Sequence, residues 1–107
     1  MEDKNPKVEI HRKICESMTD LYERKNHDYG DSFARMREEY DNAILIRIFD
    51  KYSRIKTLKS GKVAQVKDES IRDTLFDLAN YAVMEIVEME MELANDKKSN
   101  KQADTTG

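Results

Sequence analysis

Apolar residues recur every three or four positions along most of this chain, and this spacing constrains the fold more than any other feature. The longest row consists of Ile71, Leu75, Leu78, Ala79, Ala82, Ile86, Met89 and Leu93. Residues three and four apart share one face of an α-helix. The row therefore predicts a helix from Asp68 to about Ala94, roughly 39 Å long at about 1.5 Å per residue.

Two earlier rows predict two more helices. The first consists of Val8, His11, Ile14, Cys15, Met18, Leu21 and Tyr22. It predicts a helix from Pro6 to Lys25, with Asn5 as the cap and Pro6 in the first turn. The second consists of Ile44, Leu45, Ile48, Phe49, Tyr52 and Ile55. It predicts a helix from Asn42 to Lys59.

The segments between these helices carry residues that favour turns. Asn26 to Asp31 is rich in Asn, Asp and Gly and predicts a turn. A short helix carrying Phe33 and Met36 should follow, with Asp31 or Ser32 as its cap. The segment from Lys62 to Lys67 predicts a loop.

Length and composition place these helices in one all-α domain. The chain has 107 residues, and its 3 Gly and 1 Pro leave few positions for hairpin turns. We expect a small antiparallel helical bundle over residues 1–94, in which the three longer helices pack through their apolar rows, with a long C-terminal helix and a disordered polar tail over 95–107. Self-association into a homo-oligomer, a dimer or tetramer, is expected to bury Phe76, Met84 and Val87.

Charge and hydropathy exclude several classes of partner. The net charge of −3 argues against general nucleic-acid binding, which needs a surplus of Lys and Arg. No apolar run approaches the roughly 18 residues of a membrane span, and residues 1–4 lack the apolar core of a signal peptide. Cys15 is the only cysteine and is expected to be buried filler on its helical face. These features predict a cytoplasmic protein.

An acidic row lies opposite the apolar face of the last predicted helix. Glu69, Asp73 and Asp77 are spaced four apart, and Asn80 falls beside them on the helical wheel. A solvated charged face is one interpretation, although like charges at this spacing destabilise a helix slightly. The other is a Mg²⁺ site, because hard cations take oxygen ligands and often bridge to phosphates.

Cationic residues on the helix from Asn42 to Lys59 suggest a phosphate-binding role. Arg47, Asp50 and Arg54 lie together on one face, and Lys51 is adjacent. The two arginines could pair with the acidic row, or they could clamp phosphates, which match the guanidinium fork. Asp50 would then orient them or join the metal site. In the predicted turn, His27 and Tyr29 are candidates for contacts with a base.

Three blocks of this sequence resemble the nucleotide modification associated domain 1 family. They are Lys25 to Asp31, Arg47 to Arg54, and Glu69 to Tyr81, and the resemblance covers about Lys25 to Glu85. Members of this family are frequent in phages and prophages. The family name records an inferred association with modified nucleotides and not an established reaction.

The last block is also similar to the metal-binding helix of the MazG-like all-α nucleoside triphosphate pyrophosphatases. This resemblance implies that Glu69, Asp73 and Asp77 hold Mg²⁺ while water attacks the triphosphate. The pyrophosphatases carry a Glu-x-x-Glu pair on a second helix, where this chain has only Asp50 among cations. The departure suits phosphate binding at least as well as two-metal chemistry.

Three functions follow from these features, and no catalytic residue is assigned. The first is Mg²⁺-dependent release of pyrophosphate from a canonical or modified nucleoside triphosphate. The second is non-catalytic sequestration of a cyclic or signalling nucleotide, as phage sponge proteins do against bacterial defence. The third is a helical adaptor for a protein partner. The predicted nucleotide-binding residues are His27, Tyr29, Arg47, Lys51, Arg54 and Asn80, and the predicted metal ligands are Glu69, Asp73, Asp77 and Asp50.

Overall fold

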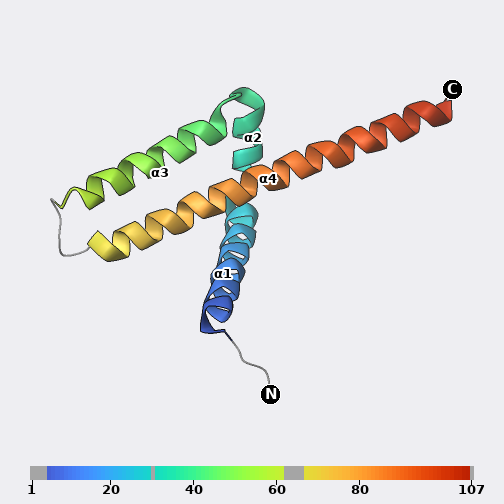
Figure 1. Ribbon diagram of the computed structural model, residues 1–107. Coiled ribbons are helices and arrows are strands. Elements are labelled where there is room, and N and C mark those ends of the chain that lie inside the picture. Colours follow the sequence, from blue (N-terminus) through green and yellow to red (C-terminus); the bar gives the residue numbers. More distant parts are fainter. Residues whose placement is uncertain (1–4, 30, 62–66, 107) are drawn as a thin grey trace, which may run out of the picture. The chain divides into compact units, whose positions relative to one another are not determined.

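The structure is a computed structural model that describes residues 5–29, 31–61 and 67–106 (Figure 1). Within these ranges it contains four helices and no strand, which confirms the all-α prediction. The helices are α1 (Pro6–Tyr29), α2 (Ser32–Glu39), α3 (Ala43–Lys59) and α4 (Lys67–Thr106). The chain divides into two compact units, Met1–Glu39 with α1 and α2, and Tyr40–Gly107 with α3 and α4.

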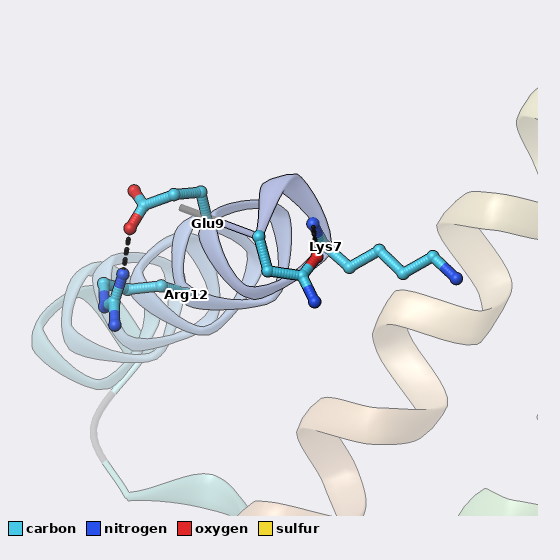
Figure 2. Close-up of polar contacts among 4 residues, drawn as sticks. Lys7, Glu9 and Arg12 are labelled. Atoms are coloured by element: carbon cyan, nitrogen blue, oxygen red, sulfur yellow. Dashed lines mark hydrogen bonds and ion pairs between the residues drawn. The ribbon is translucent and has the colours of Figure 1, made fainter. Parts of the chain in front are cut away.

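The start of α1 matches the predicted cap. The side-chain Oδ1 of Asn5 accepts a hydrogen bond from the backbone N–H of Lys7 at 2.9 Å. The Asn5 carbonyl accepts a further bond from the N–H of Val8 at 3.0 Å. These bonds satisfy donors that have no partner inside the helix. One turn further on, Glu9 and Arg12 form an ion pair on the helix surface (Figure 2).

The end of α1 corrects the sequence prediction. The predicted helix stops at Lys25 and a turn follows, whereas α1 continues to Tyr29. Asn, His and Asp are only moderately poorer helix formers than Lys, and extending an existing helix costs far less than nucleating one. His27 therefore lies in the last turn of a helix and not in a loop. Gly30 lies outside the described residues.

The short predicted helix is present as α2, and Phe33 is its anchor. Its first turn is closed by a bond from the N–H of Arg35 to the carbonyl of Asp31 at 3.1 Å. Phe33 is only 6% exposed, and Met36 is half-buried. Cys15 corrects a prediction, because it is exposed on α1 with its Sγ 3.7 Å from Nδ1 of His11. No described residue of its own unit covers that part of the helix face.

Replacing Phe33 with Ala should destabilise the protein by about 3–5 kcal/mol, the usual cost of deleting a buried phenylalanine ring. Thermal unfolding followed by circular dichroism measures the change. Glu38→Ala is the matched control, because Glu38 is an exposed residue of the same helix. An equal loss in both variants would show that Phe33 is not the anchor.

In the second unit, α3 and α4 lie side by side and run antiparallel (Figure 1). The observed start of α3 lies within one residue of the predicted start, and its end at Lys59 is as predicted. The helix ends in a tight turn, where the N–H of Ser60 bonds to the carbonyl of Thr57 at 3.1 Å. Gly61 follows with φ of 84°, a left-handed conformation that side chains with a Cβ rarely adopt.

The contact between α3 and α4 uses only part of the two predicted apolar rows. Ile44 and Ile55 on α3 and Ile71 and Leu78 on α4 are half-buried, whereas Leu45, Phe49, Ile86 and Met89 are exposed. Among the described residues of this unit, the fully buried ones are small, namely Ala43 and Thr74. The Thr74 hydroxyl donates to the carbonyl of its own helix at Ser70, at 2.7 Å, so its burial leaves no unpaired hydroxyl. Packing of α1 onto these helices stays a prediction.

The C-terminal end of α4 lies further along the chain than predicted. The sequence predicts a helix end near Ala94 and an irregular tail, whereas α4 spans 40 residues to Thr106. Lys, Gln and Ala after Ala94 are good helix formers, and the segment extends a helix that has already formed. The helix therefore continues well beyond the part that lies beside α3 (Figure 1).

Candidate functional site

Two contacts define which sides of α3 and α4 face each other. Lys51 Nζ on α3 lies 3.6 Å from Asp77 Oδ2 on α4. Four residues earlier on α3, the Arg47 guanidinium carbon lies 5.7 Å from the ring centroid of Tyr81. Because α3 and α4 run antiparallel, these two contacts are successive turns of one seam.

Arg47 is the most constrained cation of this seam. Its side chain is 33% exposed, and its guanidinium lies over the Tyr81 ring in a cation–π contact. One Nη lies 4.0 Å from a carboxylate oxygen of Asp50, one turn along α3. Among the described residues, its buried Nε has no hydrogen-bond partner. The guanidinium is thus held in position, and a ligand can reach only the exposed third of the Arg47 side chain.

Lys51 and Asp77 form an ion pair that links the two helices. The Lys51 side chain is mostly buried, and the Asp77 carboxylate is about half exposed. The sequence offered two roles for Asp77, a metal ligand or the partner of a cation on the other helix. The structure shows the second arrangement, although with Lys51 in place of the arginines.

A double-mutant cycle with Lys51→Met and Asp77→Asn should give a coupling free energy of about 0.2–1 kcal/mol, because a half-exposed ion pair is screened by water. Urea unfolding of the four proteins measures it. Arg72 and Asp73, at 3.8 Å and more exposed, supply the control pair, for which a smaller coupling is expected. A coupling well above 1 kcal/mol would show that the first pair is effectively desolvated.

The remaining predicted residues of this unit fall on one flank of the seam. By helical register, Arg54 and Asp50 on α3 lie on the same side of the hairpin as Asp73 and Asn80 on α4. We call this side the charged face, and its members are Arg47, Asp50, Lys51, Arg54, Asp73, Asp77 and Asn80. The structure therefore brings the predicted cations and the predicted carboxylates of α3 and α4 to one surface.

The magnesium ligands stay a prediction. Among the residues that the structure describes, no three acidic, histidine or cysteine side chains are grouped so as to hold a metal ion. The side chain of Glu69 lies outside those residues, so the full predicted set is not represented. The carboxylates of Asp50, Asp73 and Asp77 have the oxygen chemistry that a hard cation requires.

His27 and Tyr29 belong to the other compact unit. His27 is exposed in the last turn of α1, and Tyr29 is the final residue of that helix, with its side chain outside the described part. Their predicted contact with a base therefore stays a prediction.

Tyr81 is the site residue that the sequence interpretation missed. It lies four residues after Asp77 and next to Asn80, so its position on the acidic side of α4 was visible in the sequence. Its partner was not visible, because only the pairing of α3 with α4 places Arg47 over its ring.

The fold and site together define an all-helical protein with a charged surface on a helical hairpin. The family model described as nucleotide modification associated domain 1 matches residues 25–89, more than half of the chain. The chain belongs to this family. Neither the curated proteins nor the solved structures contain a significant match. The likeness to MazG-like pyrophosphatases stays a prediction. No described helix has the length and apolar character needed to cross a membrane.

Proposed function

We propose that this chain binds a phosphorylated nucleotide on the charged face of the α3–α4 hairpin. The observation that carries the proposal is the state of Arg47, a guanidinium held against Tyr81 on a side chain that stays 33% exposed. A fixed and partly exposed guanidinium suits a phosphate, because its planar fork forms two parallel hydrogen bonds. The family description, which concerns nucleotides, supports the same ligand class.

The other members of the charged face have defined roles in this proposal. Lys51 and Arg54 add positive charge one and two turns along α3 from Arg47. The Asn80 amide can donate to and accept from a base or a ribose hydroxyl. His27 and Tyr29 would contact the base. Binding of this kind needs only local positive charge, which is compatible with a net charge of −3.

Hydrolysis of the bound nucleotide is the first form of the proposal. Asp50, Asp73 and Asp77, with Glu69, would hold Mg²⁺, which would neutralise the triphosphate. Asp77 would have to exchange its contact with Lys51 for the metal, and the half-exposed pair makes that exchange inexpensive. Water would attack one phosphorus atom, and pyrophosphate would leave as the phosphoanhydride bond breaks.

Retention of the nucleotide without reaction is the second form. It is favoured by a specific observation, namely that Asp77 and Asp50 lie beside cations of α3. These carboxylates then position Lys51 and Arg47 for an anion and do not need a metal. A phage protein that sequesters a signalling nucleotide of a bacterial defence system requires only this affinity. Self-association of the chain, in either form, belongs to the proposal.

Incubation with a nucleotide panel tests the proposal and separates its two forms. The panel contains nucleoside triphosphates, modified triphosphates, cyclic dinucleotides and cyclic ADP-ribose isomers, each with and without Mg²⁺. Bound and free ligands are separated and identified by mass spectrometry. Mg²⁺-dependent pyrophosphate that disappears with Asp73→Ala establishes hydrolysis. A ligand retained intact and released on heating establishes sequestration. If no nucleotide binds, the proposal fails and an adaptor role takes its place.

A further inference from the structure

The α3–α4 hairpin carries a large apolar surface that no described residue of its own unit covers. At least a third of each of its large side chains is exposed, and Phe49 reaches 65%. The surface, which we call the apolar face, consists of Leu45, Ile48, Phe49 and Tyr52 on α3 and Leu75, Ile86, Met89 and Leu93 on α4.

Helical register places both rows on one side of the hairpin. The contacts of Lys51 with Asp77 and of Arg47 with Tyr81 define the inward direction of each helix. When each helix is followed from its N-terminus to its C-terminus, its apolar row is rotated by roughly 120–140° from the inward direction. The sense of this rotation is the same in both helices. Because the helices are antiparallel, equal rotations bring both rows to the same side. In this register, Ile86, Met89 and Leu93 lie on the part of α4 that continues beyond the start of α3. That side is opposite the charged face.

The size of the apolar face matches one half of a stable dimer. A large apolar side chain presents on the order of 200 Å², so eight that are about half exposed offer roughly 800 Å². The largest apolar patch on a typical monomer is only about 300–600 Å². A stable interface buries about 800 Å² on each partner.

We propose that a second copy of this chain covers the apolar face. The two hairpins pack face to face around a two-fold axis that runs across the helices, and together they form an antiparallel four-helix bundle. Two helices with one shared apolar side form half of such a bundle. The charged face of each copy lies on the outside, so the dimer leaves both candidate nucleotide sites open. The proposal does not rest on nucleotide binding.

Charge at the two ends of the apolar face selects the antiparallel arrangement. At one end, Lys56 and Lys59 are exposed and continue the α3 row one and two turns beyond Tyr52. Toward the other end, Glu90 and Glu92 are exposed and flank the α4 row near Met89, and the exposed Lys97 follows one turn beyond Leu93. A two-fold axis across the helices brings the basic end of one copy to the acidic end of the other, twice in each dimer.

A charge-swap experiment on the full chain tests both the partner and its orientation. One variant carries Lys56→Glu with Lys59→Glu, and the other carries Glu90→Lys with Glu92→Lys. Each variant gives one end of the apolar face the same sign of charge as the end of the second copy that it meets. Sedimentation velocity at low salt gives the mass, and circular dichroism verifies that each variant is helical.

The wild-type chain should sediment as a dimer, and each variant should dimerise at least about tenfold more weakly. An equimolar mixture of the variants should recover a dimer, because the heterodimer pairs opposite charges at both ends. A monomeric wild type would overturn the proposal. Variants that dimerise as tightly as the wild type, or a mixture that stays monomeric, would overturn the antiparallel arrangement.

Discussion

Replacing Arg47 with Ala should weaken nucleotide binding by about ten- to a hundredfold. Hydrogen bonds to a charged phosphate contribute about 1.5–3 kcal/mol, and each 1.4 kcal/mol is tenfold in affinity. Arg47 is the cation for which this loss should be largest, because Tyr81 and Asp50 already hold its guanidinium in position. A preorganised donor loses little side-chain entropy when the ligand arrives. Isothermal titration calorimetry with the nucleotide recovered from the panel measures the loss.

Two control variants separate the effect of the position of the Arg47 guanidinium from the effect of its charge. Arg35→Ala removes an exposed guanidinium of α2 that is not part of the charged face, and it should leave the affinity within about twofold of the wild type, as expected for a charge screened by solvent. Arg47→Lys keeps the charge but loses the planar fork, so its affinity should lie between those of the wild type and Arg47→Ala. Equal effects of Arg35→Ala and Arg47→Ala would contradict a site on the charged face and would indicate nonspecific attraction.

Replacing Ile86 with Asp should raise the dimer dissociation constant at least about a hundredfold. Ile86 is 54% exposed in the single chain and lies near the middle of the apolar row of α4. In the proposed dimer, a carboxylate at this position would be buried against apolar side chains without a partner. An unpaired polar group in such surroundings costs about 3 kcal/mol or more, which corresponds to two orders of magnitude in affinity. Sedimentation equilibrium over a concentration series measures the change.

Val83→Asp is the matched control for this variant. Val83 lies on the same helix, three residues earlier, and has a similar exposure of 47%. By register it lies outside the apolar face, on the flank with Phe76, so its replacement should leave the dimer intact. The opposite result, with Val83→Asp disrupting the dimer and Ile86→Asp tolerated, would place the interface on the flank with Phe76, Met84 and Val87 that the sequence first suggested.

The sequence predicts helices well because local spacing and capping decide them. The Asn5 cap, the short helix with Phe33 and the bounds of α3 follow from residue patterns within one or two turns. The predicted ends of α1 and α4 were wrong, because each helix continues for several residues beyond its predicted end. Both errors came from reading Asn, Asp or polar composition as a stop, although weak helix formers are tolerated once a helix exists. The helical state of His27 could not be read from composition for the same reason.

The candidate site was predictable in part. The residue types on the charged face were visible, because an acidic row and a cationic row each have helical spacing. Which carboxylate meets which cation was not visible. The pairing depends on the register between α3 and α4, and a shift of one turn would bring a different acid to Lys51. The same register places Tyr81 beneath Arg47.

The sequence by itself determined that this protein is helical, where most helices begin, and which side chains share a face of each helix. These properties depend on contacts within about four residues, which the chain order specifies directly. Only the tertiary structure decided which faces meet. The apolar rows were expected to close the α3–α4 contact, yet several of their members stay exposed and the contact also includes Arg47, Lys51, Asp77 and Tyr81. Hydrophobic burial is non-directional, so an apolar row predicts that a face will be covered and not by what.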